Sequence, residues 1–458
     1  MPLEYAQPDD PLPVAERRQA GHDLRKLVPR AQHATWQPSA ERCDPLQIML
    51  DTSRHRMASL LPIRHGRMQR SAFAFLCGSA AVMAADLATT PTSGIWVQSC
   101  GDCNLSNFGT YAARDGTPTF DITDFDETLP APFEWDLKRL ATSFAVDGRC
   151  RGMPERICRQ LAHNVVATYR HHMRTLMRLD PLTVWRSHVD ATAILQGIPD
   201  TRLRQRELKR LHTATEAHRK GYPKLLERKK SGWRIRPRPP LISPLSGQPD
   251  DTHELVARTA FEAYKFSLPE ERGVLLDRYR LTDVAFKIVG IGSVGNFCAI
   301  GLFTTRDGAT LLLQLKEAQQ SALAPYAGPS VYANQGQRVV TGQRMMQGQR
   351  DIFLGWTQEH SSDQYCYVRQ LKDSRLAPIG SEIANAAMPF YATLCGATLA
   401  RAHARSGDAA RIAGYMGSGG AFDVAIAEFA LAYAVQVEHD WRLFVEAVKA
   451  GAIEARDE

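Results

Sequence analysis

The chain has 458 residues, of which 44% are hydrophobic and 23% are charged, the composition of an ordinary soluble protein with room for two or three domain-sized units. No apolar run reaches the roughly 18–20 residues that a membrane-spanning helix needs, and the N-terminal stretch is polar, without an apolar signal core. We therefore expect a cytoplasmic protein that does not enter a membrane.

The net charge of +7 is concentrated in residues 202–238, which contain 14 Lys or Arg against three Glu. Such a segment could contact nucleic acid or an acidic partner. Its interleaved leucines and good helix formers equally fit a solvated helix, which is the interpretation we favour.

The nine cysteines are too few and too scattered to form a disulfide framework in a chain of this length. Cys100 and Cys103 form a C-x-x-C pair, but a structural zinc site would need a second pair of ligands, and Cys150 and Cys158 lack the tight spacing. We expect no metal or redox role for this pair.

The first part of the chain is predicted to be mainly helical. Residues 1–55 are polar and rich in Pro and Arg, which predicts an extended arm with a short helix. Residues 56–276 follow with a small, apolar run at 70–88, which predicts a tightly packed helix, and with alternating short strands and loops at 94–127. Five prolines between positions 237 and 249 break the helical pattern and indicate a linker.

The pattern changes to β-structure at about residue 277. Residues 277–378 predict a strand, a turn and further strands over 283–317, then a Gln-rich amphipathic helix at about 331–349 and a strand pair ending in YCYVRQL. Residues 379–458 return to a helical pattern. The sequence thus predicts an α+β protein in which the C-terminal helices complete the first, helical part.

Three oxygen-bearing side chains come from one short stretch. Asp102 and Asn107 lie in the loop GDCNLSN, and Asp124 follows in FDITDFDE. Phosphoryl transfer needs a carboxylate that orients the attacking hydroxyl group and accepts its proton, and oxygen ligands that fix Mg²⁺ against the phosphates. We predict Asp102 as the catalytic base and Asn107, Asp124 and Asp126 as metal ligands, although each residue taken singly could simply cap a turn.

These segments resemble a known pattern. GDCNLSN resembles the G-D-x-H-x-x-N catalytic loop of aminoglycoside phosphotransferases and related small-molecule kinases, and ITDFDE resembles their metal-binding strand end, where Asp124 matches the DFG aspartate of protein kinases. PFEWDLKRL resembles the helix that holds the catalytic loop through a buried aspartate, a role that the resemblance implies for Asp136. The loop histidine of those enzymes is Asn104 here, so that no imidazole can orient the loop.

A glycine-rich segment lies much later in the chain. Gly290, Gly292 and Gly295 have the G-x-G-x-x-G spacing, but a strand, a turn and a second strand follow instead of the helix that a dinucleotide-binding fold requires. A glycine hairpin over phosphates, with a strand lysine that reaches them, is the arrangement of the kinase nucleotide-binding lobe. We predict that these glycines, Ser293 and Lys316 bind the phosphates of ATP.

The order of these segments is inverted relative to kinases. The glycine loop and Lys316 come about 190 residues after the catalytic loop, so that one shared site requires a circularly permuted, two-lobe kinase-like fold. Permutation costs little where chain ends lie close together at the surface. By analogy with the kinase hinge, backbone groups at Val368 and Gln370 are predicted to contact adenine.

From about residue 20 to 450 the chain resembles the bacterial family called domain of unknown function 2252. The resemblance is carried by RMQRSAFAFLCGSAAVMAADLA, CGDCNLSNFG, FDITDFDETLPAPFEWDLKRL, GIGSVGNFCAIGLF, LQLKEA, GQRMMQGQRDIFLGW and RAHARSGD. Cys77 stands where the resemblance leads us to expect an arginine. The resemblance implies a kinase-like fold and supplies no substrate.

One departure from kinases leaves the activity open. Active kinases pair the strand lysine with a glutamate on the next helix, but no carboxylate occurs from Ala318 to Arg350. Lys316 could instead be oriented by a glutamine, by Asp124 or by nothing.

We expect an ATP- and Mg²⁺-dependent phosphotransferase whose hydroxyl acceptor, a small molecule or a protein, is unidentified. The alternatives are a nucleotide-binding, pseudokinase-like regulator and a basic-surface protein that binds nucleic acid through residues 202–238.

Overall fold

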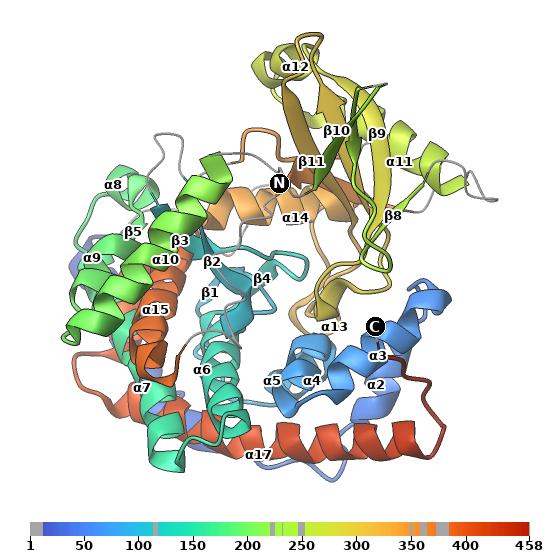
Figure 1. Cartoon of the computed structure of the whole chain (residues 1–458). Helices are drawn as coiled ribbons and strands as arrows, with labels where there is room; N and C mark the ends of the chain where they lie inside the picture. The colour runs from blue at the N-terminus through green and yellow to red at the C-terminus, as the bar shows by residue number, and fades with distance from the viewer. Residues whose placement is uncertain are drawn as a thin grey trace.

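The computed structural model describes residues 12–112, 118–219, 225–230, 232–245, 252–348, 351–357, 364–371 and 384–457. It has the α+β composition that the sequence predicts, with a helical part and a six-stranded sheet (Figure 1). The helix α14 (Gln335–Met346) lies between them and packs on both.

Four long helices form the core of the helical part. They are α6 (Phe133–Cys150), α7 (Glu155–Leu176), α15 (Met388–Ala404) and α17 (Ala421–Lys449). α7 packs against the other three, and α6 also packs against α17. α6 is therefore buried along nearly its whole length, including its charged residues.

Of the arm predicted at residues 1–55, the first 11 residues lie outside the described part, and the rest is attached to this helical part rather than extended from it. The helix α1 (Val14–Asp23) packs on α16 (Ala409–Met416). Arg25 and Arg30 donate hydrogen bonds to the carbonyl groups of Tyr415 and Met416, at 2.8 Å each. These carbonyls belong to the last turn of α16, where no further helical N–H can bond them and where the helix dipole favours cations.

Four short helices follow. They are α2 (Pro45–Asp51), α3 (Leu61–Gln69), α4 (Ala72–Gly78) and α5 (Ala80–Ala88). Three of them, α2, α3 and α4, pack on α17. The apolar run at 70–88 thus forms two helices where one was predicted. The break is at Ser79, whose backbone is not helical (φ −123°, ψ 44°) and whose hydroxyl donates to the carbonyl of Phe75.

The predicted strands at 94–127 enter two small antiparallel sheets, the first beside α6 and the second beside α15. One pairs β1 (Trp96–Ser99) with β4 (Leu129–Pro132), and the other contains β2 (Phe108–Ala112), β3 (Pro118–Ile122) and β5 (Val189–Asp190). The loop after β1 and the loop after β3 carry the predicted catalytic and metal-binding residues. Both loops therefore leave strands that are anchored in the main core.

The large sheet is antiparallel throughout, with strand order β12-β13-β11-β10-β9-β8. Its strands are β8 (Ile242–Pro244), β9 (Arg280–Lys287), β10 (Cys298–Thr304), β11 (Thr310–Glu317), β12 (Gly355–Trp356) and β13 (Cys366–Gln370). The glycine segment connects β9 to β10, and Lys316 lies on β11 opposite Tyr367 of β13. The predicted order of strands and helix from residue 283 to 349 is thus observed.

The β-rich unit begins earlier than residue 277. β8 joins the sheet, and α11 (Thr252–Ala263) and α12 (Glu270–Leu276) cover one of its faces. Phe261 and Leu276 of these helices are fully buried against the strands, which is why the segment packs with the sheet rather than with the helices to which its sequence pattern assigned it.

The basic segment lies away from the space between the two parts. Its first half is the helix α10 (Thr201–Arg219), next to α8 (Pro181–Arg186) and α9 (Ala191–Gln196) (Figure 1). Its second half includes the hairpin β6 (Leu226–Lys229) and β7 (Gly232–Ile235), whose apolar residues pack on the second face of the large sheet. Leu211 of α10 is buried, and most of the described Arg and Lys side chains of the segment are at least partly exposed.

Among the described residues, no single helix is both long and apolar enough to cross a membrane. The pair α16 and α17 meets that criterion only when the two helices are taken together, and the pair is bent by 83°.

The N-terminal segment should make the protein sensitive to acid. His33, in a 3₁₀ turn at Arg30–Ala34, is fully buried with its Nε2 2.6 Å from the Tyr415 hydroxyl oxygen, and burial together with Lys138 lowers its pKa to about 3. The unfolded chain binds a proton at this residue from about pH 6.5 downward and the folded chain does not. This residue therefore lowers the free energy of unfolding by up to about 1.4 kcal/mol per pH unit as the pH falls toward 3.

Between about pH 7 and about pH 5, the free energy of unfolding measured in urea should fall less for His33→Phe than for the wild type. Equal losses in the two proteins would contradict this assignment.

Candidate functional site

The predicted catalytic loop is closed by hydrogen bonds to Asp102. Arg139 Nε donates to Asp102 Oδ1 at 2.7 Å, and Asn104 Nδ2 donates to the same oxygen at 2.9 Å. Asn107 Nδ2 donates to the Asp102 carbonyl oxygen at 2.9 Å and to Oδ2 at 3.2 Å. The carboxylate is therefore fixed in one orientation, and the side-chain nitrogen of Asn107 faces it.

Asp136 holds the start of this loop from the first turn of α6. Its carboxylate accepts hydrogen bonds from the backbone N–H groups of Cys100, at 2.8 Å, and Gly101, at 3.1 Å, and lies 3.1 Å from His403 Nε2. This is the role that the kinase resemblance implied. Gly101 must be glycine because its φ is +80° and a Cβ there would lie 2.2 Å from the Glu127 carbonyl oxygen.

The second acidic loop follows β3 and contains two close carboxylates. Asp124 Oδ1 accepts the backbone N–H of Asp126 at 3.2 Å, and burial and the charge of Asp126 raise the pKa of Asp124. Asp126 Oδ2 accepts from Lys316 at 2.6 Å and from the Ser293 hydroxyl at 2.8 Å, and Oδ1 accepts from the Tyr367 hydroxyl at 2.6 Å. Although burial opposes it, Lys316 holds the pKa of Asp126 below its ordinary value.

Lys316 supplies the positive charge at this point. It is 2% exposed, and its Nζ lies 3.8 Å from Asp124 Oδ2 as well as 2.6 Å from Asp126. Burial alone would lower its pKa, but the two carboxylates raise the pKa above the ordinary lysine value. The partners of Lys316 are thus aspartates of the second acidic loop.

Strand alternation explains which β13 side chains reach the site. Tyr367 and Arg369 lie on the same face as Lys316, and Arg369 Nη1 donates to the Thr123 carbonyl at 2.9 Å. Val368 points to the opposite face, into the core beneath α11, and its backbone pairs with strands on both sides. The backbone N–H of Gln370 donates to Asp351 at 2.6 Å.

The glycine segment lies directly against the catalytic loop. A Cβ at Gly292 would be 3.9 Å from Asp102 Oδ2, and Ser293 bonds Asp126. Gly295 has a φ of +96°, and its carbonyl oxygen accepts from the backbone N–H of Met57 at 2.8 Å. The loop is therefore tied to the segment that precedes α3.

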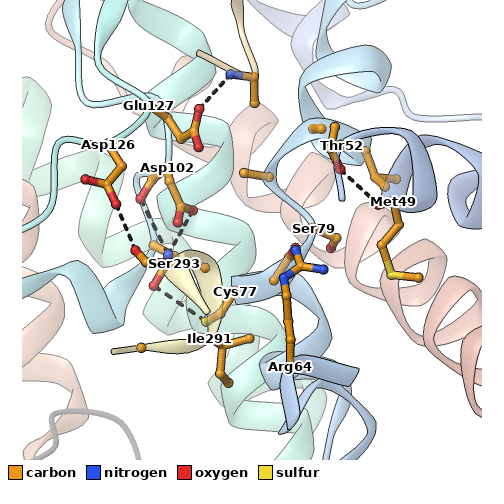
Figure 2. A pocket seen from close by; sticks show the side chains of 18 of the residues that line it. Met49, Thr52, Arg64, Cys77, Ser79, Asp102, Asp126, Glu127, Ile291 and Ser293 are labelled. Carbon is orange, nitrogen blue, oxygen red and sulfur yellow. Dashed lines mark hydrogen bonds between the residues drawn. The ribbon is translucent and has the colours of Figure 1, made fainter. Parts of the chain in front are cut away.

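A cavity of about 940 Å³ opens where these elements meet (Figure 2). Its walls come from the two acidic loops, the glycine segment and the helices α2 to α5. The predicted site residues among its lining are Asp102, Asn107, Asp124, Asp126, Gly290, Gly292 and Ser293. Gly295, Lys316, Val368 and Gln370 are not part of the lining; Lys316 is covered by Asp126, and Val368 and Gln370 are engaged within the sheet.

Two arginines of the site were not among the sequence-based predictions. Arg139 lies three residues after Asp136, and this spacing on a helix could have placed it on the same face. Arg338 of α14 donates to the carbonyl oxygens of Thr128 at 2.7 Å and Asp126 at 2.8 Å. A bond from a side chain to a distant carbonyl leaves no pattern in the sequence.

The C-x-x-C pair is buried beneath the catalytic loop. Cys100, Cys103 and Asp136 bring their ligand atoms within 4.8 Å of one another. Burial raises the pKa of Cys100 and raises that of Cys103 to about 11. Asp136 of this cluster also accepts hydrogen bonds from two backbone N–H groups of the loop.

Comparison with known families assigns the chain to one of them. A family model described as an uncharacterized protein conserved in bacteria, DUF2252, matches residues 56–447. The chain belongs to this family. The region shared with DUF2252 includes both acidic loops, the glycine segment, Lys316 and α14. No curated protein and no solved structure matches this DUF2252 chain.

Asp136 should be essential for the stability of this DUF2252 protein. In Asp136→Asn, the side-chain NH₂ group would face one of the two backbone N–H groups. That buried N–H would then have no acceptor, and the remaining hydrogen bond would no longer be to a charged group. We expect the free energy of unfolding, measured by urea denaturation, to fall by about 2–4 kcal/mol. The control Asp307→Asn, in the exposed turn between β10 and β11, should change it by no more than about 0.5 kcal/mol. Similar stabilities of the two variants would contradict the role of Asp136.

Proposed function

We propose that this protein is an ATP-dependent phosphotransferase with a circularly permuted, kinase-like fold that acts on a hydroxyl acceptor. The observation that carries the proposal is the position of Lys316. Its Nζ lies 2.6 Å from Asp126, a residue 190 positions earlier in the chain, and 3.8 Å from Asp124. To bind a nucleoside triphosphate, a kinase-like site needs a strand lysine and a metal-binding aspartate close together.

The arrangement around this point supports the proposal. A glycine loop between two antiparallel strands, a lysine on the next strand and a helix after it are features of the kinase nucleotide-binding lobe. The catalytic and metal-binding loops come from the helical part, as in kinases, but precede the sheet in the chain. A circular permutation would account for this order of the segments.

Asp102 is in position to act as the base. In the proposed reaction its carboxylate orients the acceptor hydroxyl and accepts the proton. The hydroxyl oxygen forms a bond to the γ-phosphorus of ATP as the bond to the β-phosphate oxygen breaks, which releases ADP. Arg139 and Asn104 hold Asp102 Oδ1, and Lys316 provides the charge for the phosphates.

Asn107 and Asp124 are the residues best placed to hold Mg²⁺. Within the described chain, no hydrogen bond is donated to Asn107 Oδ1 or to Asp124 Oδ2, and both residues line the cavity. The two carboxylates of Asp124 and Asp126 share one lysine, so that a negative charge remains for a cation. When bound, Mg²⁺ would neutralise the phosphate oxygens and orient them. Asp126, also predicted as a ligand, has both oxygens engaged by Lys316, Ser293 and Tyr367.

A nucleotide-binding regulator without catalysis is the second candidate. The described part of α14 carries no carboxylate, and Lys316 is instead bound by Asp126, so that the lysine must exchange partners before it can contact phosphates. Nucleic-acid binding through residues 202–238 has less support, because none of the described residues of this segment lines the cavity.

Two substitutions separate binding from chemistry. Asp124→Asn should abolish the rise in melting temperature that Mg·ATP gives the wild type, because a metal ligand loses its charge. Asp102→Asn should keep that rise in melting temperature and slow the formation of ADP by about 10²–10⁴-fold, the usual contribution of a general base. Asp307→Asn should behave as the wild type in both assays.

Three results would change the conclusion. Binding of Mg·ATP to the wild type without any ADP release would favour the regulator. A wild type that shows no melting shift with Mg·ATP would contradict both candidates. An unchanged shift in Asp124→Asn would show that Asp124 is not a metal ligand.

A further inference from the structure

The cavity has a second, basic end that the proposed reaction does not yet use. It is formed by α3, the α4–α5 junction and the residues before α3, including Arg56, Arg64 and Ser79. Figure 2 shows the Arg64 guanidinium group beside Ser79, on the other side of the view from Asp126 and Glu127. The cavity therefore joins an acidic end to a basic end.

Arg64 is a buried cation without a counter-ion. Its side chain is 2% exposed, and its Nη2 donates to the Gly78 carbonyl oxygen at 2.5 Å. Among the described residues no carboxylate forms an ion pair with it, and its Nε has no hydrogen-bond partner. Burial and the nearby Arg56 both lower its pKa. A buried, unpaired charge is costly, and an anion in the cavity would relieve that cost.

Two neighbouring groups increase the preference for an anion. The helix α5 begins at Ala80, and Ser79, Ala80 and Ala81 line the cavity. The first N–H groups of a helix have no acceptor within it, and its N-terminus carries partial positive charge. Arg56 adds a second guanidinium group, whose Nη1 donates to the Val294 carbonyl of the glycine segment at 2.7 Å while its Nε has no partner.

The carboxylates of the cavity compensate Arg56 rather than Arg64. Asp126, Glu127 and Glu317 attract Arg56. Asp51 also lines the cavity, but it pairs with the exposed Arg54 at 2.6 Å. Arg64 thus has no carboxylate partner among the described residues.

The basic end lies across Asp102 from the predicted phosphate-binding lysine. Arg64 bonds Gly78; the adjacent Cys77 has its sulfur 3.7 Å from Asn104 Oδ1, and its carbonyl oxygen would be 3.4 Å from a Cβ at Gly292. Cys77 and the catalytic loop therefore stand between Arg64 and the acidic loop that binds Lys316. A molecule held at the basic end would present its other groups to Asp102.

We propose that the basic end binds an oxyanion carried by the acceptor, so that the substrate is an alcohol bearing a phosphate or carboxylate group. The identification of the occupant as the acceptor rests on the phosphotransferase function proposed above. Arg64 and the N-terminus of α5 bind the oxyanion, and Arg56 closes the site from the glycine segment. The hydroxyl group to be phosphorylated then faces Asp102.

Inorganic phosphate is the probe for this site. Calorimetric titration at constant ionic strength should give saturable binding to the wild type, both without nucleotide and with a nonhydrolysable Mg·ATP analogue bound. Arg64→Gln should weaken phosphate binding by roughly 30-fold or more, the effect of removing one partner of a buried charged pair. Arg64→Lys, which keeps the charge but not the planar fork, should weaken it less. The matched control Arg306→Gln, at an exposed arginine in the turn between β10 and β11, should bind phosphate as the wild type does.

Each other result has a defined meaning. Equal phosphate affinities of the wild type and a folded Arg64→Gln or Arg64→Lys variant would overturn the site, as would a wild type that does not bind phosphate. Competition between phosphate and the nucleotide analogue would assign Arg64 to the nucleotide and overturn an acceptor site. Phosphate binding that depends on Arg64 in a wild type that never binds nucleotide would support the oxyanion site and overturn the phosphotransferase function.

Discussion

The ammonium group of Lys316 joins the two parts of this molecule. It extends from the large sheet and meets Asp124 and Asp126 on a loop that leaves the core of the helical part. Burial of three charged groups costs free energy unless they compensate one another. Lys316 and the nearby Arg369 lower the pKa of Asp126, whereas burial and the charge of Asp126 raise that of Asp124.

The remaining polar contacts keep the two acidic loops in one geometry. Asp136 binds the backbone where the catalytic loop starts, and Arg139 binds Asp102 within it. Both residues are on α6, a helix that is covered on several sides and cannot shift without disturbing the main core. A side chain that is held by packed neighbours needs little reorganisation when a ligand binds.

Much of this site could be predicted because its signals are local. The loop GDCNLSN, the strand end after FDIT and the helix with Asp136 each have their chemistry within a few residues, and the strands around Lys316 follow from their alternating pattern. What could not be predicted depends on residues far apart in the chain. Neither the pairing of Asp126 with Lys316 nor the lack of a described carboxylate beside Arg64 has a local pattern.

Contacts between distant residues also explain the other differences between the sequence-based predictions and the structure. The apolar face of α11 fits a helical bundle or a sheet equally well, and only the folded chain shows that it packs on the sheet. Val368 was chosen by analogy with a hinge, but its strand is an interior one whose backbone groups are already paired.

The contacts of Arg338 also connect the two parts of the molecule. This one guanidinium group donates to the carbonyl oxygens of Asp126 and Thr128 in the helical part and, at 2.8 Å, to that of Gln319 just after β11. One guanidinium group on α14 thus connects the sheet to the helical part, and any relative movement of the two parts that keeps these three hydrogen bonds must pivot at α14.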